Sequence, residues 1–295
     1  KYYFGKVDRI SPEAPVPIVN IQKEESQLGG ASNVANNIVS LGGHSLLCGV
    51  IGHDLSGKEI ERISRHKNID TFLLKTSSPT ITKARIIGGK QQIVRVDYED
   101  KSELNADNKK LFRDTISRIL PEYDILVISD YGKGLISEDL CRYLIKLAHK
   151  YDKKVIIDPK GKNWEKYSGA DIVTPNVKEL SDIVGYTVPN TDRAIEKAAR
   201  EAITNNHLTA LLVTRSDKGM SLIGPIPPIH IPTHSEEVFD VSGAGDTVVA
   251  TLGLCLAAGF EISEAMRTAN IAAGIVVKKV GTATLTIEEL VRDIQ

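Results

Sequence analysis

Short apolar runs alternate with amphipathic segments along most of this chain, and this order constrains the fold more than any other feature. Residues 45–51 are typical of a buried strand and residues 56–67 of a helix, and the same pair recurs toward the C-terminus. Such alternation is typical of right-handed βαβ units around a mostly parallel sheet, so the sequence predicts an α/β fold. Further strands are expected at 125–129, 155–158, 172–174 and 210–214, and further helices at 31–41, 107–120, 137–151, 192–205, 245–258, 263–280 and 286–294.

Two segments near the N-terminus interrupt this alternation. Residues 17–23 are extended in character and follow a proline cluster, whereas residues 82–88 and 91–97 have the pattern of two strands joined by a glycine-rich hairpin. We expect a small lid sheet beside the main domain; an edge extension of the main sheet is the alternative. The sequence thus predicts one domain over residues 1–295, with lid strands at about 12–24 and 80–98. In an open α/β sheet the ligand binds at the carboxyl ends of the strands, so the loops there are the expected site.

Composition and charge exclude several classes of function. The 295 residues carry a formal net charge of −1, which argues against electrostatic binding of nucleic acid. The three cysteines form no CxxC pair and the seven histidines no HExxH motif, so a zinc site is not expected and a reducing cytosol fits. The uncharged run at 247–260 is too short to span a bilayer, and no signal peptide is recognisable. We therefore expect a cytoplasmic protein without membrane or nucleic-acid partners; its first residue is not Met, which suggests a chain cut at its front end.

A glycine-rich stretch at residues 240–246 directly precedes a long apolar helix. Gly243 and Gly245 let the backbone approach a phosphate closely, and the first amides of a helix point outward without partners. Such a turn can stabilise the charge that develops on a phosphoryl group during its transfer. Asp246, in the first helical turn, can accept the proton of an attacking hydroxyl. A helix start whose aspartate only complements the helix dipole is the alternative.

A second glycine-rich turn opens the helix expected at 31–41. Gly29 and Gly30 let the loop pass near a ligand, and Asn33 can donate and accept hydrogen bonds to sugar hydroxyls. An ordinary turn into a helix explains the same residues.

Polar residues also follow other expected strands. Asn176 and Glu179 have the spacing of a capping box, which explains the pair without a ligand, although Glu179 can also lie near a magnesium ion through water. Lys133 and Lys160 lie in loops after two further strands, where they could hold phosphate or simply be solvated. These loops are therefore secondary candidates.

Several signatures of other enzymes are absent from the sequence. No GxxxxGK[ST] motif occurs, no GxGxxG opens a helix after a strand, and the protein-kinase signatures are missing. P-loop kinases, dinucleotide-binding dehydrogenases and protein kinases are thereby disfavoured.

Together, the motifs that are present resemble the ribokinase-like (PfkB-type) sugar kinases over essentially the whole chain. Residues 29–35, with Gly42 and Gly52 beyond them, are similar to the N-terminal signature of that family, residues 240–246 to its C-terminal signature, and residues 176–179 to its NxxE motif. The resemblance implies a three-layer α/β/α domain with a β-sheet lid. It also implies ATP-dependent transfer of a phosphoryl group to a sugar, with Mg²⁺ and, as a further candidate, K⁺.

Other segments resemble one branch of this family, the kinases of ADP-heptose biosynthesis. They are residues 9–17, 129–134, 239–241 and 279–284. They imply the anomeric hydroxyl of D-glycero-D-manno-heptose 7-phosphate as the acceptor, in the route to the lipopolysaccharide core. In many bacteria such a kinase precedes a nucleotidyltransferase domain. Ribose, fructose 6-phosphate or a nucleoside are alternative acceptors, and a non-catalytic sugar- or nucleotide-binding module is the alternative from another class.

The resemblance further implies a role for each matching residue. Asp246 would be the catalytic base, and the amides of Gly243, Ala244 and Gly245 would form the anion hole. The sugar would be held by Gly29, Gly30, Asn33 and Asp130, its own phosphate by Arg95 and Lys133, the nucleotide by Asn176, Thr214, Arg215, Gly219, Asn270 and Gly281, magnesium by Glu179 through water, and a monovalent cation by Asp240.

The chain departs from the family pattern at its start. The family begins with a strand bearing an acidic residue that binds sugar hydroxyls, and Asp8 is not a convincing replacement. That first strand is expected to be missing, and truncation explains this better than a natural absence.

The lid hairpin carries apolar residues that we expect to be exposed. Ile86, Ile87, Ile93 and Val94 could pair with a second copy of the chain, giving a homodimer through the lid.

Overall fold

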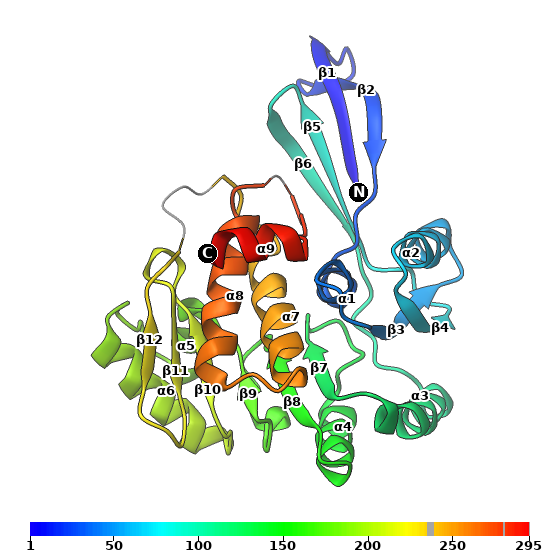
Figure 1. Cartoon of the computed structure of the whole chain (residues 1–295). Coiled ribbons are helices and arrows are strands. Elements are labelled where there is room, and N and C mark those ends of the chain that lie inside the picture. Colours follow the sequence, from blue (N-terminus) through cyan, green and yellow to red (C-terminus); the bar gives the residue numbers. More distant parts are fainter. Residues whose placement is uncertain (235–238, 280, 295) are drawn as a thin grey trace.

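The computed structural model describes residues 1–234, 239–279 and 281–294, and its largest sheet has six strands (Figure 1). In order across the sheet these are β12 (Ile229–Ile231), β11 (Met220–Ile223), β10 (Leu211–Thr214), β9 (Ile172–Val173), β8 (Lys154–Asp158) and β7 (Ile125–Ser129). Strands β7 to β10 run parallel to one another, whereas β11 and β12 run antiparallel to their neighbours. The parallel strands were expected; β11 and β12 were not, because each is too short to show a clear period.

Helices cover both faces of this sheet (Figure 1). One face is covered by α1 (Ala31–Ser40), α7 (Ala244–Ala257) and α8 (Ile262–Val276), and the other by α3 (Ala106–Ile119), α4 (Glu138–Lys150), α5 (Val177–Val184) and α6 (Asp192–Asn206). The last helix, α9 (Ile287–Ile294), packs against α8. These three layers confirm the predicted α/β class. Within the described parts of the chain, none of the helices is both long and apolar enough to cross a membrane.

Helix α8 ends at Val276, earlier than the expected end at residue 280. Val280 itself lies outside the described residues. The amide of Lys279 closes a turn on the carbonyl of Val276 at 2.9 Å. This turn lets the chain reverse, so that the amide of Gly281 reaches Asp240.

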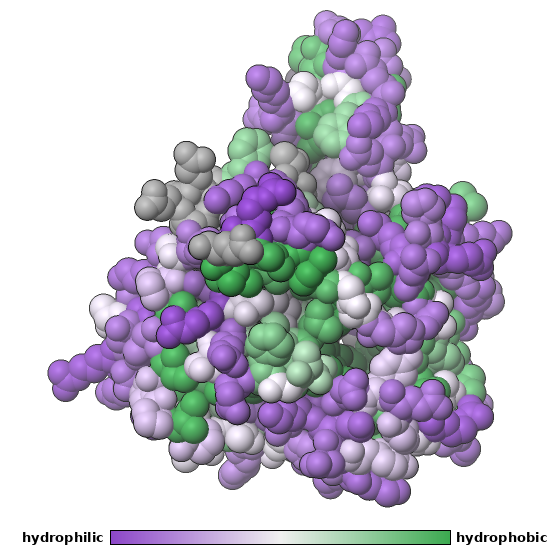
Figure 2. Space-filling model, in the orientation of Figure 1, coloured by the Kyte–Doolittle hydropathy of each residue, from purple (hydrophilic) through white to green (hydrophobic). Residues whose placement is uncertain are grey.

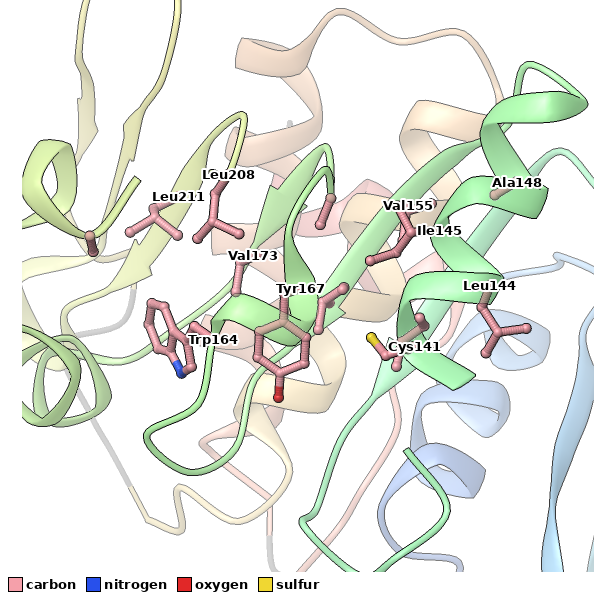
Figure 3. Close-up of a cluster of buried hydrophobic side chains, with 14 of the residues drawn as sticks. Cys141, Leu144, Ile145, Ala148, Val155, Trp164, Tyr167, Val173, Leu208 and Leu211 are labelled. Carbon is pink, nitrogen blue, oxygen red and sulfur yellow. The ribbon is translucent and has the colours of Figure 1, made fainter. Parts of the chain in front are cut away.

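Successive residues of the central strands are buried on opposite faces of the sheet. Val155 and Ile157 pack in the cluster on the α4 side, whereas Ile156 packs in the cluster on the α7 side. Figure 3 shows Ile145 of α4 beside Val155. Burial on both faces is the reason that β8 reads as a continuous apolar run rather than an alternating one.

A separate sheet of four strands projects from the main domain (Figure 1). In order these are β2 (Pro17–Glu25), β1 (Tyr2–Ile10), β5 (Thr82–Gly88) and β6 (Gln91–Tyr98), with β5 and β6 forming the expected hairpin. Among the described residues no strand of this sheet pairs with the six-stranded sheet, so it is a lid and not an edge extension. Strand β1 was not expected. Residues 11–16 form the turn between β1 and β2, because prolines there cannot donate to a ladder.

A third sheet pairs β3 (Leu46–Gly52) with β4 (Asp70–Thr76) in parallel, connected by α2 (Leu55–His66). In the part of the chain that the structure describes, no strand pairs with the remaining edge of β3 or of β7. A cavity of about 1220 Å³ is lined by both strands and continues to the N-terminus of α7. The space beside β3 and β7 therefore connects with the candidate site.

Candidate active site

Three loops meet at the mouth of this cavity. Gly30 comes from the start of α1, Tyr131 follows β7, and Gly243 and Asp246 lie at the start of α7; all four line the cavity. The structure thus brings together the two glycine-rich motifs, which are more than 200 residues apart in the sequence. The site lies at the carboxyl end of a parallel strand, as the fold class predicts.

Helix α7 begins at a turn that glycine adopts without strain. Gly243 has a φ of +83°, and a Cβ there would lie 3.0 Å from Nδ2 of Asn33. The amide of Ala244 donates to the carbonyl of Val241 at 3.2 Å, whereas that of Gly245 has no hydrogen-bond acceptor among the described residues. The amide of Gly245 is therefore open to an anion at the positive end of the helix dipole.

Asp240 shapes the loop in front of α7. Its Oδ1 accepts a hydrogen bond from the amide of Ser242 and its Oδ2 one from the amide of Gly281, both at 2.9 Å. Burial disfavours the charged carboxylate, but these hydrogen bonds, together with the charge of Arg85, outweigh burial and lower the pKa of Asp240. A charged Asp240 thus joins this loop to the segment before α9.

Asp246 is buried, with 6% of the residue exposed, and its carboxylate is held from two sides. Nδ2 of Asn33 donates to Oδ2 at 2.8 Å, and the hydroxyl of Tyr131 donates to Oδ1 at 3.2 Å. Burial raises the pKa of Asp246, and the two hydrogen bonds oppose that rise. The carboxylate is therefore oriented and more basic than an exposed aspartate. A base of this kind next to an open helix amide can deprotonate a hydroxyl while the amide stabilises a negatively charged group.

Asp158, at the end of β8, was not predicted as a site residue. Burial and the nearby charges of Asp246 and Glu179 raise its pKa to about 8, although Lys160 opposes this rise. Three carboxyl groups are thus close enough to disfavour one another's charged forms, and a cation would relieve their repulsion. Asp158 lies at the carboxyl end of an expected strand, and this position could have marked it as a candidate site residue.

Asn176 and Glu179 form a capping box at the start of α5. Oδ1 of Asn176 accepts from the amide of Glu179 at 2.9 Å, and Oε2 of Glu179 accepts from the amide of Asn176 at 3.2 Å. Oε1 of Glu179 accepts from Nζ of Lys160 at 3.0 Å. The cap fixes the direction of Glu179, which therefore stays near Asp158.

The turn before α1 lies against Tyr131. Gly30 has a φ of +56°, and a Cβ there would lie 3.4 Å from the Tyr131 ring, whereas a Cβ on Gly29 would meet no atom within 4 Å. The buried amide of Asn33 binds Asp246, so its role in this arrangement is to hold that carboxylate. Tyr131 was not predicted as a site residue, although it lies in the polar loop that the sequence singled out.

Asp130, predicted to bind the sugar, is turned into the main domain. Its Oδ2 accepts from Nζ of Lys166 at 2.5 Å and from the hydroxyl of Tyr167 at 2.7 Å. Its Oδ1 accepts from the amide of Gly132 at 2.7 Å. Both oxygens are engaged, so Asp130 holds the loop that carries Tyr131.

Arg95 and Lys133, predicted to bind the sugar's phosphate, each pair with a carboxylate. Arg95 donates to Asp97 of the same strand through Nε and Nη2, both at 2.9 Å. Lys133 pairs with Glu99, directly after β6. The second pair joins the loop after β7 to the lid.

Thr214, which was predicted to bind the nucleotide, is the last residue of β10. Arg215 follows it and is 3% exposed. Its guanidinium donates to Asn190 at 2.9 Å, to Asp192 at 2.5 Å and to Ser221 at 2.9 Å. Arg215 therefore supports this loop from inside.

Gly219 and Asn270 also have structural contacts on this side. Gly219 has a φ of +74°, and a Cβ there would lie 2.0 Å from the carbonyl oxygen of Ile231. Nδ2 of Asn270 donates to the carbonyl of Pro232 at 2.6 Å. Gly219 thus lets the chain before β11 pass close to β12, and Asn270 joins α8 to the segment that follows β12.

The model of the pfkB family of carbohydrate kinases matches residues 2–289 of this chain. Two proteins described as bifunctional protein HldE, one from a Nitratiruptor species and one from Haemophilus influenzae (strain PittEE), are 43% and 45% identical to it over 289 and 292 residues. These alignments cover 98% of this chain but 61% and 60% of the relatives. The chain therefore spans about three fifths of the length of the curated relatives that it matches.

Solved structures share the fold. Phosphofructokinase-2 from Escherichia coli in complex with potassium superposes with a TM-score of 0.78 at 21% identity, covering 99% of this chain and 94% of that one. Ribokinase from Arabidopsis thaliana complexed with ribose and ATP gives 0.78 at 20% identity, covering 100% and 95%. With nearly the whole length matched by the family model, and with both glycine-rich motifs meeting at one site, this chain belongs to the pfkB family of carbohydrate kinases.

Proposed function

We propose that this chain transfers the γ-phosphoryl group of ATP to the anomeric hydroxyl of D-glycero-D-manno-heptose 7-phosphate, in the cytoplasmic synthesis of ADP-heptose. The observation that carries the reaction type is the buried carboxylate of Asp246 at the start of α7, beside the open amide of Gly245. The choice of heptose 7-phosphate is supported by the segments at residues 9–17 and 129–134, which resemble heptose kinases, and by the identity of 43–45% to the HldE proteins.

Asp246 takes the proton as the anomeric oxygen attacks the γ-phosphorus. A bond forms between that oxygen and the phosphorus while the bond to the β,γ-bridging oxygen breaks, and ADP leaves. The amide of Gly245 and the helix dipole stabilise the charge on the phosphoryl oxygens. Asn33 and Tyr131 keep the carboxylate aimed at the acceptor. Lid closure over the sugar would exclude water from this step.

Glu179 would hold Mg²⁺ through water, and the ion would neutralise negative charge on the phosphates of ATP. Within residues 1–234, 239–279 and 281–294 no group of three or more His, Cys, Asp or Glu side chains could hold a metal ion alone, which fits an ion held mainly by nucleotide and water. The raised pKa of Asp158 supports a cation here, because a positive ion would favour its charged form. The charged carboxylate of Asp240 would support a monovalent ion such as K⁺ at the loop before α7.

ATP would extend from Gly245 toward the end of β10. Thr214, Gly219 and Asn270 would border it, with Gly281 on the side of the adenine. Arg215 would act as a positioning residue, because its guanidinium is occupied within the protein.

A homodimer through the lid is part of the proposal. The expected exposure holds for Ile93 and Val94, at 37% and 44%, whereas Ile86 and Ile87 are only partly exposed because β5 is an inner strand of the lid. Val94 and Val96, the latter 38% exposed, alternate along β6 with Arg95, so they lie on the other face of the lid from it. Figure 2 shows hydrophobic residues among hydrophilic ones on the visible face of the lid. In the described parts of the chain no further strand pairs with β2 or β6 at the two edges of this sheet. An apolar face beside such open edges favours a second copy as its partner.

ADP release with a panel of acceptors tests the function. The panel contains heptose 7-phosphate, unphosphorylated heptose, ribose, fructose 6-phosphate and a nucleoside, each with ATP and Mg²⁺. We expect ADP above the background rate with heptose 7-phosphate and much less with the others. Faster ADP release with another acceptor would identify that acceptor as the substrate. Binding of sugar and ATP without ADP release from any acceptor would show a binding module and contradict the proposed kinase activity.

A further inference from the structure

Lys166 is a cation whose side chain is only 12% exposed, although it does not line the cavity. It belongs to the short turn η2 (Glu165–Tyr167), which follows β8. Its Nζ donates to Oδ2 of Asp130 at 2.5 Å and to the carbonyl of Ile136 at 3.3 Å. Asp130 and Ile136 stand near the two ends of the loop between β7 and α4. One ammonium group therefore ties together both ends of the loop that carries Tyr131.

Tyr167, the next residue, binds the same carboxylate. Its hydroxyl donates to Oδ2 of Asp130 at 2.7 Å and accepts a hydrogen bond from the amide of Lys160 at 3.0 Å. This hydroxyl thus joins the loops that follow the neighbouring strands β7 and β8. Tyr167 and Trp164 are fully buried in the main hydrophobic core, where Figure 3 shows both side chains. The core therefore holds the turn that carries Lys166.

The fixed carboxylate of Asp130 sets the position of Tyr131. Its Oδ2 is held by the two donors of η2, while its Oδ1 accepts from the amide of Gly132 at 2.7 Å. Tyr131 thus stands between two residues that one carboxylate fixes. Its hydroxyl donates to Oδ1 of Asp246 at 3.2 Å. A continuous chain of contacts runs from the ammonium group of η2 to the proposed base.

Removal of this ammonium group would leave a buried charge without its partner. The Asp130 side chain is 2% exposed, and an uncompensated buried carboxylate is strongly unfavourable. The loop would relieve this cost by turning Asp130 toward water, which would displace Tyr131. The hydrogen bond from Tyr131 to Asp246 is already longer than the usual distance between two oxygens, so a small displacement breaks it.

We propose that Lys166 is a positioning residue of the phosphoryl transfer, which acts through Asp130 to hold the Tyr131 hydroxyl on the carboxylate of Asp246. The inference rests on the proposed function and adds a residue that touches neither substrate. Asp158 also lies near that carboxylate, and none of the variants below alters it. Loss of Lys166 should therefore affect the base as loss of the Tyr131 hydroxyl does.

Lys166→Met removes the charge and keeps an unbranched stem. We expect it to move the acidic limb of kcat/KM to higher pH by as much as Tyr131→Phe does, measured with the acceptor that releases ADP fastest. The double variant should show no further shift, because the effects of residues that act as a unit do not add. An unmoved limb in folded Lys166→Met, or shifts that add in the double variant, would overturn the proposal.

Two further variants at the same turn separate positioning from general support of the fold. Lys166→Arg keeps the charge and should return the limb most of the way to its wild-type position. Lys162→Met, at an exposed lysine of the same connection, is the matched control and should leave the limb in place.

Tyr167→Phe decides the question if circular dichroism shows that Lys166→Met is unfolded. It removes one hydrogen bond to Asp130 and keeps the buried ring and the ion pair of Lys166. The limb should move in the same direction by a smaller amount. An unmoved limb in folded Tyr167→Phe would then contradict the proposal.

Fluorine NMR gives a readout that does not depend on activity. When all nine tyrosines are replaced by 3-fluorotyrosine, the signal that Tyr131→Phe lacks belongs to Tyr131. This signal should shift in Lys166→Met and stay in place in Lys162→Met, and an unmoved signal in folded Lys166→Met would contradict the contact chain. If the wild type releases no ADP with any acceptor, the proposed function fails, while this signal still decides whether Lys166 positions Tyr131.

Discussion

The pocket around Asp246 and the inner face of the lid differ in how their charges are satisfied. In the pocket, Asn33 and Tyr131 from two other parts of the chain bind the carboxylate of Asp246. On the lid, Lys83 and Arg85 form no ion pair among the described residues, although Asp97 lies opposite Lys83 and the charge of Arg85 lowers the pKa of Asp240. A complete set of protein contacts fixes a reacting group before the ligand arrives, whereas an unsatisfied charge leaves a partner for the ligand to supply. We therefore assign the proton transfer to the pocket, where the carboxylate is oriented before the ligand arrives.

Asp246→Asn should have the largest effect, because it removes the proton acceptor while keeping the shape of the side chain. We expect kcat to fall about 10³-fold with little change in the affinity for ATP. Steady-state kinetics and calorimetric ATP binding measure the two quantities separately. Turnover close to that of the wild type would mean that Asp246 is not the base, and Asp158 would be the next carboxyl group to test.

Gly243→Ala should have the next largest effect. A Cβ at this position, where φ is +83°, would press on Nδ2 of Asn33 and disturb both the helix start and the carboxylate that Asn33 holds. We expect a loss of about 10-fold or more in kcat, comparable to misplacing one catalytic contact. Gly42→Ala is the matched control, because Gly42 has the same φ but a Cβ there would meet no atom within 4 Å. Equal losses of activity in the two variants would mean that only the backbone strain matters.

Tyr131→Phe should shift the pH profile more than the maximal rate. The Tyr131 hydroxyl stabilises the charged form of Asp246, so its removal raises the pKa of that carboxyl further. A base must be deprotonated to act, and activity should therefore be lost at higher pH as the solution is acidified. The acidic limb of kcat/KM should therefore move to higher pH in Tyr131→Phe. Tyr98→Phe, on the exposed lid, should leave the limb in place.

Val94→Lys should have the smallest effect on turnover and a clear effect on assembly. A charge on the apolar face of the lid would oppose burial against a second copy. We expect the wild type to be a dimer and Val94→Lys a monomer by sedimentation, with kcat per chain nearly unchanged. The control variant Gln91→Lys, at the first residue of the same strand, should remain dimeric. If the wild type sediments as a monomer, the proposed homodimer is wrong.

The sequence predicts the backbone turns of the site better than the contacts of its side chains, for a physical reason. Backbone properties decide where α7 begins and how Gly243 turns, and these can be read from local residue types. The contacts of Asp130 cannot be read in this way, because Lys166 and Tyr167, which bind its carboxylate, lie more than 30 residues away in the sequence. For the same reason the inward direction of Arg215 depends on side chains that come from other elements.

Strand β1 could not be predicted from an alternation of apolar and polar residues. Its sequence mixes aromatic, charged and glycine residues, and register shifts near Phe4 and Val7 interrupt its pairing with β2. A bulge changes the face on which the next side chain lies, so no regular alternation develops. The contact between Lys83 and Tyr131 could not be predicted either, because it joins the lid hairpin to a loop that follows β7 in another sheet.

Phosphorus NMR of the reaction with ATP and heptose 7-phosphate tests the assignment of this site most directly. The wild type should form one new phosphate ester, whose phosphorus couples to the anomeric proton, in equal amount to ADP, and Asp246→Asn should form almost none. A new ester at another carbon, or ADP formed without any sugar ester, would contradict the placement of the anomeric hydroxyl between Asp246 and the amide of Gly245.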